Sequence, residues 1–591
     1  MFIPTTLEES KQLGWNKLDI VLITGDSYID SPFIGAAVIG KVLIQAGFRV
    51  GIIAQPRVDQ PDDITRLGEP GLFWGVTAGS IDSMVANHTA TLKKRKSDDY
   101  TPGGINNRRP DRATIVYSNL IRRYFKQTVP IVLGGIEASL RRVAHYDYWT
   151  DRLRGSVLLD AKADFLIYGM GESAVLSLAN ALRASGSPHD LPGICYASSQ
   201  PPAEFLQLPS FEEVCADKKA FIEMFHTFYN NNDPITARGL CQKHGTRWLI
   251  QNPPAPHLTQ AELDSIYALD YERAQHPFYE NQGQVRALDT IRFSLSTHRG
   301  CYGECNFCSI AVHEGRTVRW RSMKSIVREA ETLTKHPDFK GYILDAGGPT
   351  ANMYGFECQR KESLGACPDK RCLYPEVCSA LKPNHQPQVE LLKRLRALPG
   401  IKKVFVASGL RYDLLLADSA SRDAYISELA GHHVSGQLKV APEHVSFKVL
   451  KKMGKPGVSS LGDFKQRFDR ASRLAGKDQY LTYYFIAAHP GCSDRDMGAV
   501  QDFASRELHL QPEQVQIFTP TPSTYSSLMY YTEMDPFSGE SMFVEKTLAG
   551  KLKQKGIVVA EKAQPQKSAR PRPGTEQRER RNPPARSYRK K

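Results

Sequence analysis

Three cysteines stand within eight residues of this chain, in the segment RGCYGECNFCSI (residues 299–310). They follow a strand-like apolar run and have the spacing C-x3-C-x2-C: Cys301, Cys305 and Cys308. An aromatic residue, Phe307, precedes the last of them. Thiolates are soft ligands that suit zinc, copper(I) and iron–sulfur clusters. The segment therefore predicts a metal centre with three thiolate ligands.

Two kinds of metal centre fit three thiolates. A structural zinc usually has four protein ligands, and His298 or His313 could supply the fourth. Ordinary cubane clusters also use four cysteines, so a cluster on three leaves one iron open to a substrate or cofactor. Redox-active cysteines without a metal are a third interpretation.

A glycine pair follows the next strand-like run, in DAGGPT (residues 345–350). Paired glycines let a ligand approach the backbone closely, although an ordinary turn between a strand and a helix also fits. Glu443 follows a later strand-like run, and its carboxylate could bind ribose hydroxyls or form a structural ion pair. The segment GRTVRWRS (315–322) has Arg316, Arg319 and Arg321, which could bind carboxylates or phosphates or form an exposed basic face. Lys439 could pair with a carboxylate or point at a ligand. The last candidates are chosen for their place near strand ends: His444, His489, Tyr525 and Tyr530.

A second group of cysteines lies in a polar segment with glycine and proline, residues 352–378. Its members are Cys358, Cys367, Cys372 and Cys378. A metal would supply order that such a loop does not gain from packing, so we expect an auxiliary iron–sulfur cluster or a zinc. The alternative is a set of buried, redox-inert thiols. The isolated cysteines are expected to be core thiols: Cys195, Cys215, Cys241 and Cys492.

The elements that must position these residues fall into two series. Residues 18–54 read as strand, glycine-bearing loop, amphipathic helix and strand, which is a βαβ unit. Further buried-strand runs are expected at 71–77, 113–118, 130–135 and 164–169. We predict a doubly wound parallel sheet over residues 1–200, followed by a connecting segment with some helix over 201–289.

The second series runs over residues 290–545. Strands are expected at 291–297, 341–346, 402–408, 436–441, 481–487 and 515–520, with helical patterns between them. Six such repeats predict a (β/α)6-type partial TIM barrel. Chemistry in such a barrel belongs to the loops after the strand ends, which is where the three cysteines and the glycine pair stand.

The chain ends in a basic stretch, which we expect to form a largely disordered tail over 546–591. The net charge is +14, and residues 561–591 hold 11 Lys and Arg against 3 Glu. The tail is either a solubilising extension or an arm for RNA. We find no secretory signal pattern and no apolar run long enough to span a membrane, so a soluble cytoplasmic protein is expected.

The three-cysteine spacing in this strand context resembles the radical S-adenosylmethionine (radical SAM) superfamily. The resemblance implies a [4Fe–4S] cluster on Cys301, Cys305 and Cys308, with the cofactor on the fourth iron. It also implies reductive cleavage of the cofactor to a 5′-deoxyadenosyl radical. Cofactor contacts are implied for Phe307 (adenine), Gly347, Gly348 and Pro349 (methionine) and Glu443 (ribose).

The N-terminal half resembles the cobalamin-binding-type domains that precede many radical SAM barrels, through PIVLGGIEAS (130–139) and the glycines of the segment 163–182. Its first loop, GDSYIDSPFIG, departs from the cobalt-ligating pattern D-x-H-x-x-G: it has Asp30 and Gly35 but no histidine. Axial ligation, and with it cobalamin as a cofactor, is therefore not expected. Over residues 15–545 the chain resembles the YgiQ-type radical SAM proteins, a family that implies cofactor and fold but no substrate.

Two classes of function follow. The first is a radical SAM enzyme with an electron donor such as flavodoxin or ferredoxin. RNA modification is one reaction for it, because the tail is basic and the strand pattern is similar to the methylthio-transferring branch. The second is a metal-stabilised, non-catalytic RNA-binding module. An electron-transfer protein is a weaker third class, since it would need no glycine pair after the second strand.

Overall fold

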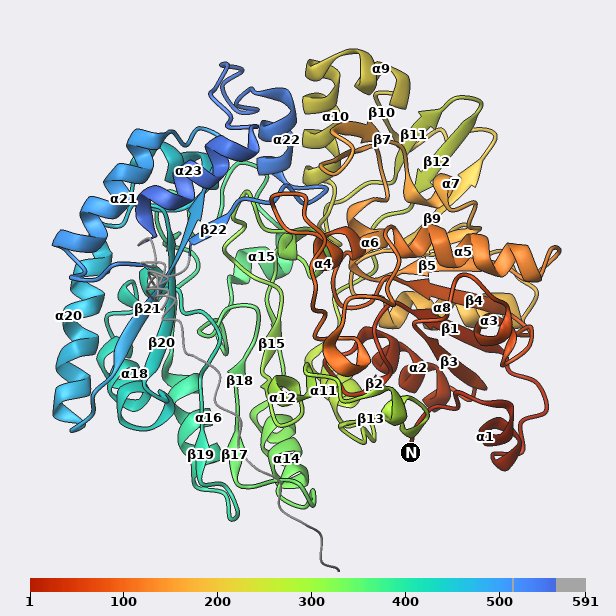
Figure 1. The fold of residues 1–591 in the computed structure, drawn as a ribbon, viewed down its shortest axis with the longest axis horizontal. Helices are drawn as coiled ribbons and strands as arrows, with labels where there is room; N and C mark the ends of the chain where they lie inside the picture. The colour runs from red at the N-terminus through yellow and green to blue at the C-terminus, as the bar shows by residue number, and fades with distance from the viewer. Residues whose placement is uncertain (513–514, 560–591) are drawn as a thin grey trace, which may run out of the picture.

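The computed structural model describes residues 1–512 and 515–559. It contains two α/β parts that lie side by side (Figure 1). The N-terminal part is built on one large sheet, and the C-terminal part on short parallel strands wrapped by helices. Within the described residues, no helix combines the length and the apolar character needed to cross a membrane.

The large sheet has nine strands in the order β10-β11-β12-β9-β8-β5-β4-β1-β3. Five neighbours are parallel: β3 (Val50–Ala54), β1 (Ile20–Thr24), β4 (Phe73–Thr77), β5 (Ile131–Gly134) and β8 (Phe165–Ile167). Because β3 and β4 lie on opposite sides of β1, the strand order reverses there. The remaining strands add a mostly antiparallel edge: β9 (Ile194–Ser198), β12 (Arg247–Gln251), β11 (Leu240–His244) and β10 (Leu206–Leu208).

Both faces of this sheet are covered, as the doubly wound prediction requires. Along β1, Ile20 and Leu22 join one apolar cluster, and Val21 and Ile23 join the other. The first cluster includes helices α2 (Gly35–Gln45) and α8 (Glu172–Arg183), and the second includes α5 (Ala113–Tyr124) and α6 (Gly135–Leu140). Alternate side chains of a strand point to opposite faces, so a continuous apolar run serves both cores.

Two expectations for this half are wrong. Residues 113–118, predicted as a strand, begin helix α5. Its buried positions follow a helical stripe that includes Tyr117, Leu120 and Ile121, so packing overrides the β-branched composition. The segment 201–289, expected to connect the two series with some helix, also supplies three strands of the large sheet. Its helices are α9 (Phe211–Ala216), α10 (Lys218–Asn230) and α11 (Gln260–Tyr267).

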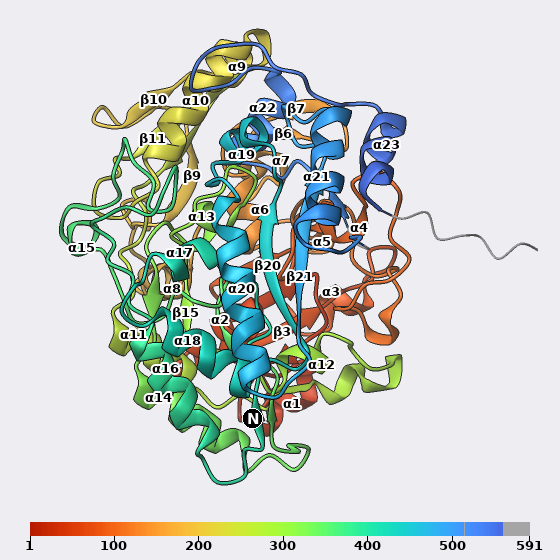
Figure 2. The ribbon, with the colours of Figure 1, turned by 90° about the vertical axis from the view of Figure 1, so that its left-hand side faces the viewer.

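The C-terminal part contains the six predicted strand positions, several of them shorter than expected. The strands are β14 (Leu295–Ser296), β17 (Tyr342–Ile343) with β18 (Ala346–Gly347), β19 (Lys403–Val404), β20 (Gln437–Glu443), β21 (Tyr480–Ala487) and β22 (Val515–Ile517). Every pairing among them is parallel. Helices α14 (Met323–Leu333), α16 (Gln386–Arg396), α18 (Arg422–Glu428), α20 (Ser459–Leu474) and α21 (Asp494–Arg506) pack outside; Figure 2 shows α20 and α21 on the outer side of β20 and β21.

The predicted disordered tail over 546–591 is wrong for its first part, because residues 548–558 form helix α23 (Leu548–Val558). Gln554 accepts a hydrogen bond from the Ala488 backbone and donates one to the Cys492 carbonyl. Lys551 is buried between the rings of Tyr148, in the N-terminal part, and Tyr530. Buried polar contacts therefore order a segment whose composition predicts disorder. Residues 560–591 lie outside the described part of the chain.

Candidate functional site

The three-cysteine loop is closed at its base by a short antiparallel ladder. Strand β15 (His298–Arg299) pairs with β16 (Arg319–Trp320), so the chain leaves the barrel after β14, forms the loop and returns. Gly300 has φ +80°, and a Cβ there would lie 2.5 Å from the Thr317 carbonyl oxygen. Only glycine fits this position without displacing the returning strand.

The three thiols lie close together around the turn at Gly303. A Cβ on this glycine would lie 3.2 Å from Cys301 Sγ and 3.7 Å from Cys305 Sγ. The Gly303 backbone N–H donates to Cys301 Sγ over 3.3 Å. Burial raises the pKa of the Cys301 and Cys308 thiols, and the neighbouring Cys305 raises both further. A bound cation would reverse this, because coordination deprotonates a thiol.

A cation of the protein already faces these thiols. Arg411 Nη1 lies 3.8 Å from Cys305 Sγ, and its guanidinium is fixed by a bidentate pair with Asp413 at 2.8 and 2.5 Å. This side chain is buried. The guanidinium lowers the pKa of the Cys301 thiol against the larger, opposite effect of burial, so Arg411 is a candidate site residue that sequence reasoning missed.

No three His, Cys, Asp or Glu side chains of residues 1–512 and 515–559 converge as they would around a single metal ion. The two histidines considered as a fourth zinc ligand each have a partner at Nδ1, whereas the buried Nε2 of His298 has none among the described residues. His313 Nδ1 lies 3.0 Å from Ser139 Oγ in the N-terminal part, and His298 Nδ1 lies 2.9 Å from Thr297 Oγ1. A cubane has four irons and holds its thiolates farther apart than one ion does, so this finding concerns a single ion and not a cluster.

The glycine pair lies directly beside the cysteine loop. Gly347 ends β18 opposite Ser296 of β14, and its carbonyl accepts from the Thr297 N–H. A Cβ at Gly348 would lie 2.6 Å from His298 Nε2, so a side chain has no room there. After Pro349, the hydroxyl Oγ1 of Thr350 lies 3.6 Å from Cys301 Sγ. The turn and the thiols thus form one continuous surface.

Glu443 lies at the end of β20, one residue inside the strand rather than beyond it. It has φ +68°, a strained value for a residue with a side chain, and its carboxylate lies 3.5 Å from Lys455 Nζ. Ala488, just after β21, has φ +58°. Such strain concentrates at functional sites. Phe307 packs edge-on against His489, with ring centroids 6.4 Å apart.

The second cysteine segment covers the outside of the three-cysteine loop. Cys358 is buried in an apolar cluster with Tyr302 and Phe356, and it precedes helix α15 (Gln359–Leu364). Cys372 Sγ accepts from Lys361 Nζ over 3.6 Å. The segment's four cysteines, which include Cys367 and Cys378 and all lie in the described part of the chain, do not converge as they would around a single ion, and neither do the three thiols of the loop. Packing and polar contacts order part of this segment, and a metal site on its cysteines stays a prediction.

Ion pairs join the two cysteine regions through Glu304, which follows the first of the three thiols. Arg316 Nε donates to its carboxylate over 2.8 Å, and Lys361 Nζ lies 3.6 Å away. The carbonyl of Glu304 accepts from Arg371, and Arg316 also donates to the Cys367 carbonyl. The second segment is therefore clamped onto the loop that carries the thiols.

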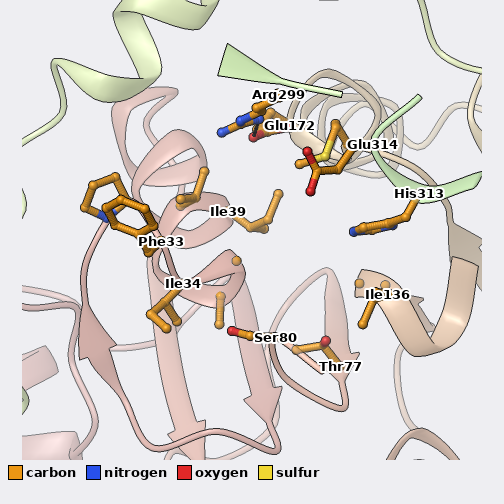
Figure 3. Close-up of a pocket in the computed structure, with 18 of the residues that line it drawn as sticks. Phe33, Ile34, Ile39, Thr77, Ser80, Ile136, Glu172, Arg299, His313 and Glu314 are labelled. Atoms are coloured by element: carbon orange, nitrogen blue, oxygen red, sulfur yellow. Dashed lines mark hydrogen bonds and ion pairs between the residues drawn. The ribbon is translucent and has the colours of Figure 1, made fainter. Parts of the chain in front are cut away.

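A cavity of about 510 Å³ lies between the large sheet and this surface. One wall is made by the residues after β1, β4, β5 and β8, and the other includes Gly347, Gly348 and Pro349. Figure 3 shows His313 and Glu314 pointing into the cavity, with Ile34 and Ile39 across from them. In the sequence, only the glycines after these strands indicate where the cavity lies. Its walls come from both parts of the molecule, so the cavity forms only when the two parts pack together.

Comparison with known proteins identifies the family. The description Radical SAM N-terminal matches residues 2–294, and Radical SAM superfamily matches 295–504. A UPF0313 protein of Fusobacterium nucleatum is 58% identical over 558 residues, covering 94% of this chain and 98% of that protein. This chain belongs to the YgiQ-type (UPF0313) radical SAM family. A UPF0313 protein of Thermotoga maritima is 50% identical and covers 95% of this chain and 99% of that protein.

Solved radical SAM structures are similar at low sequence identity. The radical SAM methyltransferase TsrM from Kitasatospora setae, solved with cobalamin and a [4Fe-4S] cluster, has a TM-score of 0.48 at 14% identity, over 86% of this chain and 77% of that one. The cobalamin-dependent enzyme OxsB, solved with aqua-cobalamin and S-adenosylmethionine, has a TM-score of 0.48 at 13% identity, over 89% and 56%.

Several candidates chosen for their place near strand ends have structural partners in this radical SAM protein. His489 bonds Ser526 over 2.7 Å, and Tyr525 bonds His226 over 3.1 Å. His444 Nε2 lies 3.5 Å from Cys492 Sγ. Lys439 is exposed on β20. Arg319 and Arg321 pair with Glu362 and Glu329, so the interpretation of GRTVRWRS as an exposed basic face is wrong.

Proposed function

We propose that this protein is a radical SAM enzyme that binds a [4Fe–4S] cluster through Cys301, Cys305 and Cys308. S-adenosylmethionine would bind at the glycine turn beside them. The observation that supports this most directly is the contact between the two: Cys301 Sγ lies 3.6 Å from Thr350 Oγ1, in the turn that Gly347 and Gly348 begin. When bound, cluster and cofactor would supply reductive cleavage to a 5′-deoxyadenosyl radical.

The donor set fits a cluster on three thiolates. Two of the three sulfurs lie against one glycine turn: the Gly303 N–H donates to Cys301 Sγ, and the Arg411 guanidinium faces Cys305 Sγ. Hydrogen bonds and positive charge near cluster sulfurs are known levers on such centres. The second cysteine segment would keep water and oxygen from this side of the loop. In this proposal it is a cover and not an auxiliary metal site.

The chain's other residues have positioning roles in this proposal. Gly347 and Gly348 leave room for the methionine part of the cofactor, and Pro349 fixes the turn that follows. Glu443 would bind ribose hydroxyls while Lys455 fixes its carboxylate. Phe307 would pack on the adenine. Reduction requires an electron donor, for which we propose a flavodoxin or ferredoxin.

We do not propose cobalamin as a cofactor. The loop after β1 contains no histidine. Its Asp30, the counterpart of the aspartate in the cobalt-ligating pattern, is buried and paired with Lys41 at 3.0 Å. This carboxylate therefore already has a structural partner.

Cofactor cleavage tests the proposal. The protein is reconstituted anaerobically with iron and sulfide, reduced with dithionite and given S-adenosylmethionine, and 5′-deoxyadenosine is quantified. We expect product from the unaltered chain and none from the triple alanine variant of Cys301, Cys305 and Cys308. The Cys215→Ala variant is the matched control, because this cysteine lies elsewhere and is exposed, so the expectation of a core thiol is wrong for it. Equal product from the triple variant would contradict the proposal.

A further inference from the structure

The cavity between the sheet and the barrel lies at the strand-order reversal of the large sheet. Its wall includes Thr24 and Asp26, after β1, and Gly79 and Ser80, after β4. In open parallel sheets, ligands bind outside the carboxyl ends of the strands where the strand order reverses. Its volume, about 510 Å³, is in the range of small-molecule sites.

Polar groups without partners point to a ligand here. Glu172, the first residue of α8, is 4% exposed and lines the cavity. Its Oε1 accepts from Arg299 over 2.5 Å, but its buried Oε2 has no hydrogen-bond partner among the described residues. The Ser80 hydroxyl, on the same wall, is also buried without a partner there. Buried polar atoms in native structures normally have one, so both atoms are free to bind a ligand.

His313 offers a donor from the opposite wall. The Ser139 hydroxyl accepts from the Gly169 N–H, and its own proton has His313 Nδ1 as its acceptor at 3.0 Å. The ring proton is therefore assigned to Nε2. The pKa of His313 is lowered to about 4 by burial, so the ring stays neutral. Figure 3 shows the ring directed into the cavity.

The charges of the wall exclude polyanions. Among the described lining residues, four are acidic and one is basic: Asp26, Glu172, Glu314, Asp345 and Arg299. The one guanidinium is already paired with Glu172. Phosphate groups are normally bound by free Arg or Lys side chains. Most of the remaining wall is apolar, with Phe33, Ile34, Ile39, Ile136, Met170 and Val175.

We propose that this cavity binds the substrate of the enzyme, and that this substrate is an uncharged, largely apolar small molecule. Its carbonyl-type oxygen accepts from His313 Nε2, and its hydroxyl or amide N–H donates to Glu172. The inference rests on the proposed function, because the cavity reaches the glycine turn at which S-adenosylmethionine would bind. It assigns the carboxyl edge of the large sheet to substrate binding and excludes nucleic acid from it.

The test uses prodan, an uncharged naphthalene dye with one carbonyl group, whose emission shifts with hydrogen bonding and polarity. It is titrated into the purified full chain. We expect saturable binding to one site, with an affinity that changes little between about 50 mM and about 500 mM salt, because no ion pair is formed. Pyrophosphate, a short RNA oligonucleotide and cobalamin are not expected to displace it.

Variants of residues that line the cavity test whether the dye binds there. Ile136→Trp and Ile39→Trp fill it from two elements and should each weaken binding by about tenfold or more. Ile235→Trp, a half-exposed position outside the cavity, is the matched control and should bind normally. His313→Phe keeps an aromatic ring but removes the donor. We expect about three- to tenfold weaker binding and a blue-shifted emission.

Circular dichroism melting verifies that each variant is folded. The inference is overturned if the unaltered chain does not bind prodan saturably, or if both filled variants, while folded, bind it normally. Displacement by pyrophosphate or RNA would assign the cavity to an anion, and displacement by cobalamin would assign it to a corrin. Cofactor cleavage without prodan binding overturns this inference alone. Prodan binding without cofactor cleavage contradicts the proposed function and with it the assignment of this ligand as a substrate.

Discussion

The three-cysteine loop (299–310) and the second cysteine segment (352–378) are similar in composition but different in structure. In the loop, the Cys301 and Cys305 thiols lie against the glycine turn, where one faces a backbone N–H and the other faces the Arg411 guanidinium. In the segment, Cys358 is 7% exposed within an apolar cluster, and ion pairs hold the chain in place. In the proposed function, the loop is the ligand set and the segment is its cover. The surroundings of the sulfurs, and not the density of cysteines, would then distinguish the two regions.

Replacing one cysteine of each region by serine tests this difference most strongly, because only the loop is proposed to bind iron. Cys301→Ser should lose nearly all of about four irons per chain. Cys358→Ser should keep them and lose about 1–3 kcal/mol of unfolding free energy, since a hydroxyl enters an apolar cluster. Iron analysis and chemical denaturation measure both. Equal iron loss in the two variants would show that the second segment also binds metal.

The glycine turn beside the loop sharpens the contrast, because it has no counterpart in the second segment. In Gly348→Ala, the new methyl group would lie 2.6 Å from His298 Nε2. The turn must shift, and we expect about 100-fold less 5′-deoxyadenosine formation. Gly409→Ala, at a nearby glycine where an added Cβ would have no atom within 4 Å, is the control and should stay active. An active Gly348→Ala enzyme would remove this turn from the site.

Breaking the clamp between the two regions should have a moderate effect. Glu304→Gln removes the negative charge that pairs with Arg316 and Lys361. Because the second segment would then be held less firmly, we expect the cluster to be lost about tenfold faster in air. The visible absorbance of the cluster measures this rate. Glu357→Gln, in the second segment but outside this clamp, is the matched control. An unchanged rate in Glu304→Gln would mean that the cover does not protect the cluster.

Acid should lower the stability of the protein through the two histidines that flank the loop, and this is the smallest effect that we expect. Burial lowers the pKa of both His298 and His313 from 6.5 to about 4, and the second segment contains no histidine. As pH falls from 6.5 toward 4, these histidines become protonated in the unfolded chain but stay neutral in the folded protein. The free energy of unfolding therefore falls in this window. His313→Gln removes part of this dependence. We expect its melting temperature to drop by about 2–4 °C less than that of the unaltered chain between the two ends of this window. An identical drop would assign the pH dependence to other groups.

The sequence predicts the cysteine loop, the glycine turn and the parallel strands, because each depends on residues that are neighbours in the chain. Residues 113–118 show where prediction from neighbouring residues fails. Their apolar, β-branched composition suits a strand, but they form a helix because one helical face of α5 packs against the sheet. Arg411 is 103 residues from Cys308, and no local pattern places it against the thiols. Contacts of this kind, like the cavity, appear only when distant segments pack.

Helix α23 has a consequence for how the molecule is assembled. Lys551 lies between Tyr148 and Tyr530, so the last described helix fastens the N-terminal part to the barrel. In the order of synthesis this fastener follows the last barrel strand, β22, so the pairing of Lys551 with Tyr148 forms only after both sheets are complete. Other contacts between the two parts, such as the pair of Arg299 with Glu172, come from residues that are synthesised earlier. Helix α23 is thus a late addition to an interface that earlier residues begin.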